Sequence, residues 1–413
     1  MVAFIGPTTF ADIFYLVYAV PNMLRRLLGE GALTSALIPV FKSVETEDGA
    51  EEARKFASRV ITLQVVATSA FTLLVIAGCV ALWLFSEENS LGRVYAEYTA
   101  AIVPYAIFIC AAALFGALLN TRGVYFVPPL MQTLINLVWI AASVVAGLVV
   151  GARYGLLGLS LSIVAACAVG AWLLWRLLAM KGVRVSLTLS EKLKTARMKG
   201  FLRMFGITLI GVASYPVNLL ADRFMAQFIV NEEGAVTCLY QGDRLMQVPF
   251  GVLAVSIGTV ALAELSKVAA DKRRFFAGFT RAMRLSLFLA VPMAAVMALL
   301  STQIVDLTLN YGEFANLERI RALDRTSLAL LCYSLGLPGY FAVTCLTRSY
   351  FARQEMLTPV KVSWWMVALN IGLNILLLWL TDRRGGARPF LGCRRSAERN
   401  AALHHHGLQM ALD

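Results

Sequence analysis

Long apolar segments alternate with short polar connections along almost the whole chain, and the length of these segments sets the architecture. A helix needs about 20 mostly apolar residues to cross the hydrocarbon core of a bilayer. We place segments of this kind at about residues 8–41, 60–85, 98–119, 127–150, 155–179, 200–230, 235–263, 283–305, 325–347 and 358–380. The pattern predicts an all-α polytopic membrane protein with about ten transmembrane helices.

Composition agrees with this fold class and excludes a soluble enzyme. Of the 413 residues, 59% are hydrophobic and only 15% are charged, whereas soluble domains have about 25% charged residues. The formal net charge of +12 is explained first by cytoplasmic loops, which carry the Lys and Arg excess of a membrane protein. We therefore expect the phospholipid bilayer as a partner and no nucleic acid.

Prolines interrupt many of the apolar segments. They stand at Pro21, Pro39, Pro104, Pro216, Pro249, Pro292 and Pro338. Broken helices persist in a membrane where neighbouring helices, polar side chains or water satisfy the released carbonyl groups. This favours a transporter whose helices surround a cavity. The alternative is a rigid bundle with ordinary proline kinks.

The orientation follows from the Lys and Arg residues in alternate connections. One set of connections carries 22 of them and the other set carries five, namely Arg93, Arg153, Arg319, Arg321 and Arg325. The basic set is expected in the cytoplasm, which places Met1 on the outer face. An outer N-terminus without a signal peptide suggests that a preceding helix is missing from this chain.

Two halves of the chain share an order of elements at an offset of 231 residues. Arg122 precedes Pro128 by six residues, as Arg353 precedes Pro359. The repeat predicts two related lobes. We expect an N-terminal lobe at 1–180, a basic cytoplasmic linker at 181–203, an incomplete C-terminal lobe at 204–380 and a polar basic tail at 381–413. We expect truncation at both ends, with a non-native or frameshifted tail; a genuine basic extension is the alternative.

Charged residues inside the apolar segments are costly and are therefore candidates for function. They are Asp12, Arg25, Arg26, Glu30, Asp222, Arg223, Asp243 and Arg244. Arg26 and Glu30 are four residues apart and can pair, while Arg25 points about 100° away on the same helix. Together with an arginine from the second half, these groups could clamp a diphosphate. The alternative is that Arg25 and Arg26 are anchors that reach toward lipid headgroups.

Catalytic groups are missing from the apolar part of the sequence. The three histidines, His404 to His406, stand together in the polar tail. Acidic residues of the outer connections, such as Glu87 and Glu313, have no histidine nearby in the sequence. A membrane glycosyltransferase or phosphatase would need such a constellation. We therefore predict a protein that is not an enzyme.

Three stretches resemble one family. They are VPNMLRRLLGEGA at residues 20–32, YQGDRLMQVPFG at 240–251 and SYFARQEMLTP at 349–359. These stretches resemble the MurJ (MviN) lipid II flippases of the MOP exporter superfamily. The resemblance covers roughly residues 6–380. The resemblance implies two MOP/MATE-like lobes around a central cationic cavity. It also implies movement of lipid II, an undecaprenyl-pyrophosphate-linked precursor, from the cytoplasmic to the outer leaflet of the bacterial cytoplasmic (inner) membrane.

The resemblance also assigns site residues. It places Asp12, Arg25, Arg26 and Glu30 on the second helix of the family and Asp243 and Arg244 on the eighth, as substrate-binding residues. It suggests a sodium ion at Asp222, Asn370 and Asn374, although the family expects an acidic ligand where Asn374 stands. Coupling to sodium or to the membrane potential is therefore open, and the oligomeric state is not indicated.

Departures from the family leave two further interpretations. The first helix and the last three helices of the family have no counterpart here, which agrees with the repeat. The chain could be an inactive fragment of such a flippase. It could also be a related MOP-superfamily exporter of another lipid-linked oligosaccharide or of a drug.

Overall fold

The computed structural model describes residues 6–88, 90–145, 152–187, 196–230, 232–269, 271–316, 321–353, 355 and 357–383. Within these ranges the regular structure is entirely helical, as predicted. The first bundle contains α2 (Thr9–Leu24), η1 (Arg25–Gly31), α3 (Ala32–Glu47), α4 (Ala50–Phe85), α5 (Leu91–Ile102), α6 (Tyr105–Thr121), α7 (Val127–Val145) and α8 (Ala152–Met180).

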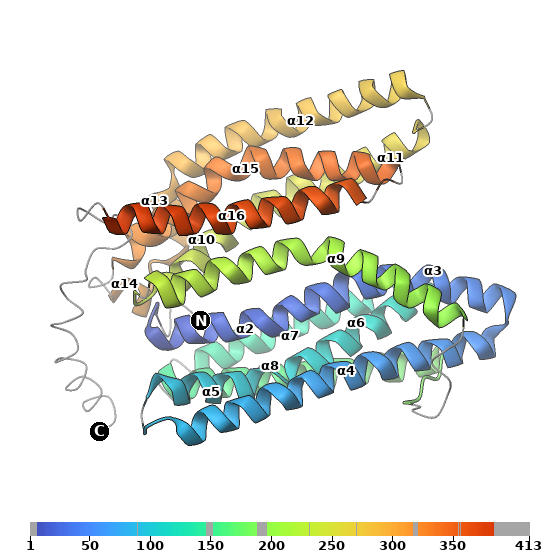
Figure 1. Ribbon diagram of the computed structural model, residues 1–413, viewed down its shortest axis with the longest axis horizontal. Helices are drawn as coiled ribbons and strands as arrows, with labels where there is room; N and C mark the ends of the chain where they lie inside the picture. Colours follow the sequence, from blue (N-terminus) through green and yellow to red (C-terminus); the bar gives the residue numbers. More distant parts are fainter. Residues whose placement is uncertain are drawn as a thin grey trace.

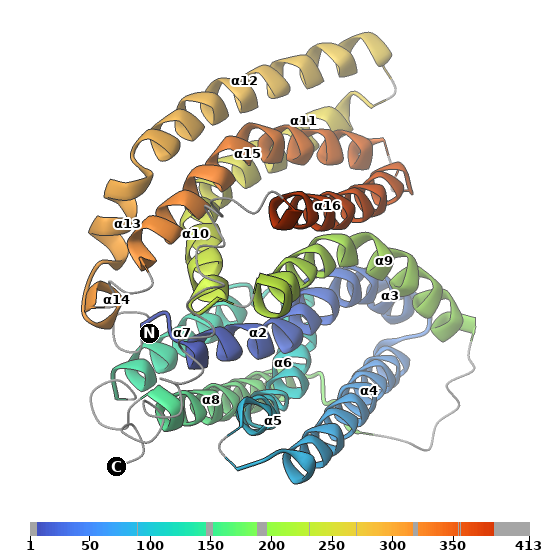
Figure 2. The ribbon, with the colours of Figure 1, turned by 60° about the vertical axis from the view of Figure 1, so that its left-hand side comes forward.

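The second bundle follows in the chain and lies beside the first (Figure 1). It contains α9 (Ala196–Met225), η3 (Ala226–Val230), α10 (Ala235–Pro249), η4 (Phe250–Ala254), α11 (Val255–Lys267), α12 (Lys272–Leu299), α13 (Ser301–Leu309), α14 (Glu313–Asn316), α15 (Ala322–Ala352) and α16 (Leu357–Arg383). Helix α9 lies at the boundary, where it packs against α3 and η1 on one side and α16 on the other (Figure 2).

Nine helical stretches of the described residues are long and apolar enough to span a membrane. They correspond to the second through tenth predicted segments. The first predicted segment is the continuous helical run of α2, η1 and α3, whose apolar sequence is interrupted by Asp12, Arg25 and Arg26. Large apolar side chains such as Leu74 and Phe288, each 73% exposed, face outward as lipid-facing groups do. The protein is a multi-span membrane protein.

The two bundles share a local distortion at equivalent places. A π-helical turn, η1, separates α2 from α3, and another, η4, separates α10 from α11. Pro21 and Pro249 stand shortly before these turns. Proline has no N–H to donate and its ring crowds the carbonyl of the preceding turn, so it weakens the regular hydrogen bonding of the helix beside these turns. The offset of 231 carries Thr121, where α6 ends, onto Ala352, where α15 ends.

The basic connections gather at one end of the molecule. In Figure 1 the turns from α3 to α4, α6 to α7, α11 to α12 and α15 to α16 all lie at the right. Residues 196–203 of the predicted basic linker are the first two turns of α9, where Met198 and Phe201 are buried in the core of the first bundle. The lobe boundaries remain predictions, and the predicted tail, 381–413, lies almost wholly outside the described residues.

One apolar core joins the two bundles at the opposite end. Buried Phe14 and Tyr105 of the first bundle belong to the same cluster as Leu330 and Phe341 of the second. A second cluster, which holds Phe41 and Phe56, lies near the basic end and includes from the second bundle only the start of α9. Burial of shared apolar surface therefore holds the bundles together at the end away from the basic connections.

Candidate functional site

Asp12 connects the two bundles. Its side chain is 1% exposed, and its carboxylate accepts hydrogen bonds from the backbone N–H groups of Gly234 (2.7 Å) and Thr237 (2.8 Å) and from the Thr237 hydroxyl (2.6 Å). These donors lie at the start of α10, where the first N–H groups of a helix have no partner within the helix. A carboxylate satisfies these groups and is favoured by the helix dipole.

The resemblance assigned Asp12 to the substrate-binding residues, and that role stays a prediction. In the structure its acceptors are used by α10, because the N–H groups at a helix start need acceptors and α10 begins directly opposite α2. Gly234 precedes α10 with φ of 77°, a conformation that glycine adopts without strain.

Two tyrosine rings continue the contact between α2 and α10. The rings of Tyr15 and Tyr240 stack with their centroids 4.3 Å apart. The amide of Gln241 donates to the Tyr15 hydroxyl at 3.0 Å. This pair lies between Asp12 and the arginine residues and was not indicated by the sequence analysis.

Of the two arginine residues on η1, Arg26 faces the second bundle, whereas Arg25 interacts electrostatically with Tyr18, Tyr105 and Cys110 of the first bundle. The Arg25 Nε donates to Asn22 Oδ1 at 3.0 Å, which fixes this guanidinium one turn along its own helix. The Arg26 guanidinium carbon lies 5.6 Å from the ring centroid of Tyr215 on α9. Both arginine side chains are half-buried. The predicted pair of Arg26 with Glu30 lies outside the described side chains.

Arg244 and Asp243 lie on α10, as the repeat suggested. The Arg244 Nε donates to the Tyr240 hydroxyl at 3.0 Å and its Nη1 to Gln247 Oε1 at 3.5 Å, and the residue is exposed. Asp243 is 5% exposed and accepts a hydrogen bond from the Gln247 amide at 2.6 Å. The carboxylate of Asp243 also interacts electrostatically with Arg223, Arg244 and Arg26. The predicted acidic and basic residues of the second half are thus close together.

Arg223 is a site residue that the sequence analysis noted as a charge but did not assign. Its side chain is only 6% exposed, and its guanidinium carbon lies 4.9 Å from the ring centroid of Tyr240. Arg244 lies 5.0 Å from the same centroid. Aromatic faces attract cations, so Tyr240 helps to hold two positive charges near each other. The signal in the sequence was an arginine inside an apolar helix.

We call Arg25, Arg26, Arg223 and Arg244 the arginine cluster. Its members come from η1, α9 and α10 and therefore from both bundles. Asp222 interacts electrostatically with both Arg223 and Asp243, so the four guanidinium groups and the carboxylates of Asp222 and Asp243 leave a net charge of +2 on these six side chains. Such an excess in a membrane protein attracts anions strongly, because the surrounding medium of low dielectric constant screens charge poorly.

The residues proposed for sodium also lie together. The Asn374 amide donates to Asp222 Oδ1 at 2.9 Å and to Asn370 Oδ1 at 3.0 Å. These contacts join α9 to α16. Asp222 and the two asparagines offer oxygen atoms of the type that hard cations prefer. Among the described residues, no group of three or more His, Cys, Asp or Glu side chains is placed to hold a metal ion.

Comparison with known proteins identifies the family. The sequence profile described as lipid II flippase MurJ matches residues 1–383. The lipid II flippase MurJ of Burkholderia cenocepacia is 27% identical, over 87% of this chain and 70% of its own length. The probable lipid II flippase MurJ of Vibrio cholerae is 28% identical, over 98% of this chain and 77% of its own.

Solved structures show the same fold. A lipid II flippase MurJ in an inward closed conformation matches with a TM-score of 0.72 and 24% identity, over 90% of this chain and 75% of its own. An inward-facing MATE multidrug transporter of the MOP superfamily matches with a TM-score of 0.69 and 13% identity, over 87% of this chain and 83% of its own. The predicted MOP/MATE-like architecture is therefore confirmed, and the family profile covers most of the chain. This chain belongs to the lipid II flippase MurJ family.

Proposed function

We propose that this protein moves lipid II from the cytoplasmic to the outer leaflet of the bacterial cytoplasmic membrane, without covalent chemistry. The observation that carries the proposal is the arginine cluster, to which both bundles contribute. Arg26 contacts Tyr215 across the boundary between bundles, and Tyr240, which faces Arg223 and Arg244, stacks on Tyr15. The relatives described above carry the name of this activity.

The chemistry of the cluster suits a pyrophosphate. A guanidinium group offers two parallel N–H donors to phosphate oxygens, and such charged hydrogen bonds are roughly twice as strong as neutral ones. Arg25, Arg26 and Arg244 are half-buried or exposed and would contact the ligand directly. Buried Arg223 would act through the electrostatic field and through Tyr240. In the absence of ligand, Asp243 and, by the family resemblance, Glu30 would balance part of the positive charge.

Alternating access requires the bundles to separate at one end and then at the other. The contacts of Asp12 with α10 and the shared apolar core close the end away from the basic connections. If the basic end is cytoplasmic, this arrangement is closed toward the outside. Opening to the outside would then break the Asp12 hydrogen bonds, and the bound substrate would have to offset that cost.

Sodium coupling belongs to the same proposal. A cation between Asp222, Asn370 and Asn374 would join α9 to α16, and Arg223, the neighbour of Asp222, is a member of the arginine cluster. Cation binding would therefore change the positions of charges at the substrate site. Coupling to the membrane potential remains the alternative, because the cluster itself carries net positive charge.

Complementation tests the proposal. The chain is expressed in bacterial cells depleted of their own lipid II flippase, and growth is scored together with the amount of protein in the membrane. We expect rescue by the wild type and by Arg281→Ala, which removes an arginine of α12 outside the cluster. We expect no rescue by Arg25→Ala or Arg244→Ala at equal protein levels.

Two outcomes would overturn the proposal. Rescue by both cluster variants would exclude the pyrophosphate clamp. A wild-type chain that accumulates in the membrane without rescue would favour the inactive fragment, or an exporter of another compound. Competition between labelled lipid II and other lipid-linked oligosaccharides in vesicles separates these last two.

A further inference from the structure

A second basic site lies at the end of the molecule that carries the basic connections, away from the arginine cluster. It is a cavity of about 300 Å³. The cavity is lined by Arg54, Lys55, Ser58 and Arg59 of α4 and by Arg184, Val185 and Ser186, which follow α8. None of these residues belongs to the proposed transport site.

The segment after α8 is held firmly against α4. Residues 183–187 have no regular secondary structure, and burial alternates along them, with Val183 and Val185 buried and Arg184 and Ser186 exposed. Val183 and Val185 are 2% and 7% exposed and belong to the core of the first bundle. The Ser186 N–H donates to the Ser58 hydroxyl at 3.2 Å, and the Trp175 indole donates to the Val185 carbonyl at 3.2 Å. This alternation directs Arg184 outward to the cavity.

The charges of the cavity favour an anion. Four of its seven lining residues are cations. Lys55 forms ion pairs with Glu51 (3.3 Å) and Glu52 (2.9 Å). In the part of the chain that the structure describes, no acidic side chain lies within ion-pair distance of Arg54 or Arg184. Those two guanidinium groups approach one cavity from different segments, which suits the several oxygen atoms of a phosphate group.

The cavity lies at the depth of lipid headgroups. Exposed apolar side chains on α4 begin at Val66, which is seven residues after Arg59. At 1.5 Å per residue this separates Arg59 from the apolar surface by about 10 Å along the helix. Trp175 of α8, 38% exposed, donates to the carbonyl of Val185 in the cavity lining, and Trp172, 54% exposed, precedes it by one turn. Tryptophan is enriched where the hydrocarbon core meets the headgroups.

We propose that this cavity binds the phosphate group of an anionic phospholipid in the leaflet that the basic connections face. The phospholipid would hold the segment after α8 against α4 and thereby fix the first bundle at the membrane surface. The site is independent of the proposed transport activity, because it shares no residue with the arginine cluster or with the bundle contact at Asp12.

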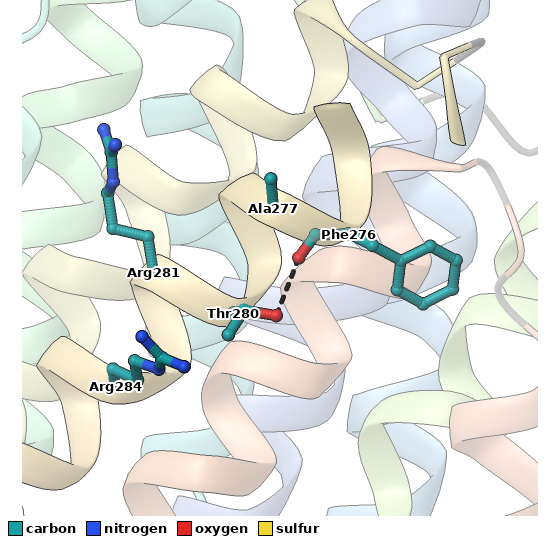
Figure 3. Close-up of a pocket in the computed structure, with 5 residues that line it drawn as sticks. All are labelled: Phe276, Ala277, Thr280, Arg281 and Arg284. Carbon is teal, nitrogen blue, oxygen red and sulfur yellow. Dashed lines mark hydrogen bonds between the residues drawn. The ribbon is translucent and has the colours of Figure 1, made fainter. Parts of the chain in front are cut away.

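Another basic hollow provides a control. Figure 3 shows Arg281 and Arg284 beside Phe276, Ala277 and Thr280. All five residues come from α12 alone. The Thr280 hydroxyl donates to the Phe276 carbonyl within the helix at 2.8 Å. This hollow is positively charged like the cavity at α4, but one helix alone forms it. Substitutions here therefore test whether binding requires the specific cavity or only positive charge.

The test uses native mass spectrometry of the purified full chain in detergent, titrated with phosphatidylglycerol. We compare the wild type with Arg54→Gln/Arg184→Gln and with Arg281→Gln/Arg284→Gln. Each cation near an anionic membrane surface contributes a factor of about five in affinity. We therefore expect the first double variant to bind the tightest phosphatidylglycerol roughly 30-fold more weakly, and the second to bind it as the wild type does.

Titrations with phosphatidylcholine and with inorganic phosphate distinguish the source of the phosphate. We expect weaker binding of phosphatidylcholine and no displacement of lipid by millimolar inorganic phosphate. Equal binding of phosphatidylcholine, full displacement by inorganic phosphate, or an equal loss in the α12 variant would each overturn the proposal. Arg54 and Arg184 are exposed, so an unchanged thermal midpoint should accompany the variant and exclude misfolding.

Discussion

At the scale of single residues, Asp12 shows how one carboxylate can control the contact between two bundles. It is buried in apolar surroundings, and three donors of α10 converge on it. Burying a charge is costly unless hydrogen bonds replace its water. The same hydrogen bonds satisfy N–H groups that α10 cannot satisfy itself. The Asp12 carboxylate and the N–H groups at the start of α10 therefore satisfy each other's hydrogen-bonding needs, but only while the two bundles stay together at this end.

Substitution of Asp12 should weaken this closure in a graded way. Asp12→Ala leaves buried N–H groups of Gly234 and Thr237 without an acceptor, at about 1–3 kcal/mol each. Asp12→Asn keeps one acceptor oxygen and should cost less. We expect the thermal midpoint in detergent to fall in the order wild type, Asn variant, Ala variant, and rescue of flippase-depleted cells to fall in the same order. Equal midpoints for all three proteins would contradict a stabilising role.

Arg223 and Tyr240 show a limit of reading residues one at a time. The sequence marks Arg223 as an expensive charge in an apolar helix, and nothing in it indicates the partner. Tyr240 reads as an ordinary aromatic residue of α10, yet its ring faces two guanidinium groups and stacks on Tyr15. Such a contact depends on how α2, α9 and α10 pack, which residue spacing within one helix does not determine.

At the scale of helices, the apolar pattern predicted that the membrane-spanning helices exist and in which order they follow. It did not predict where a helix is locally distorted. The nine spans coincide with nine predicted segments because hydrocarbon thickness fixes the length of any spanning helix. The π-helical turns η1 and η4 follow Pro21 and Pro249, but a proline alone predicts a break of any kind. Likewise, the charges of 181–203 predicted a basic linker but did not indicate that its last residues, 196–203, begin α9 and bury Met198 and Phe201.

The contact between α10 and α15 depends on one glycine. A methyl group at Gly242 would lie 3.0 Å from the Ala329 Cβ and 3.2 Å from the Leu330 backbone nitrogen. A backbone atom cannot move aside as a side chain can, so Gly242→Ala must displace one helix. Overpacking of this kind costs about 1–3 kcal/mol. We expect a lower thermal midpoint and weaker rescue, since Asp243 and Arg244 follow directly.

Gly339→Ala is the matched control for this prediction. Gly339 also lies in a helix, α15, and a methyl group there meets no atom within 4 Å. Alanine has a higher helix propensity than glycine, so this variant should be as stable as the wild type or slightly more stable. If Gly242→Ala has the same midpoint as Gly339→Ala, the two helices have room to separate and the close contact has no energetic importance.

At the scale of the whole molecule, the two ends differ in what joins the bundles. The end that holds Asp12 has buried apolar contacts shared by both bundles. At the basic end, polar contacts contribute: Arg197 of α9 donates to Glu47 at 2.7 Å and pairs with Asp48 at 3.1 Å. Both acidic groups are substantially exposed, and exposed ion pairs contribute little to stability. The start of α9 is also held there by buried Met198 and Phe201, but the other described helices of the second bundle have no residue in this apolar cluster, so we expect them to separate more easily at the basic end.

The orientation in the membrane decides from which leaflet a substrate could reach the arginine cluster through the basic end. The basic end should face the cytoplasm, because Lys and Arg concentrate in its connections. Single cysteines at Glu88, in the connection from α4 to α5, and at Lys272, at the start of α12, report on the two ends. The background carries Cys332→Ser and Cys393→Ser, since the other five cysteines are buried.

A membrane-impermeant maleimide should label Glu88→Cys in intact spheroplasts and Lys272→Cys only after permeabilisation. That result places Asp12 and the shared apolar core on the outer side, so the contacts that close the described arrangement face outward, as expected of an exporter that takes up its precursor from the cytoplasm. The reverse labelling would place the basic end outside. The same closed contacts would then block entry from the cytoplasm, and both the direction of transport and the assignment of Asp12 to outer closure would have to be abandoned.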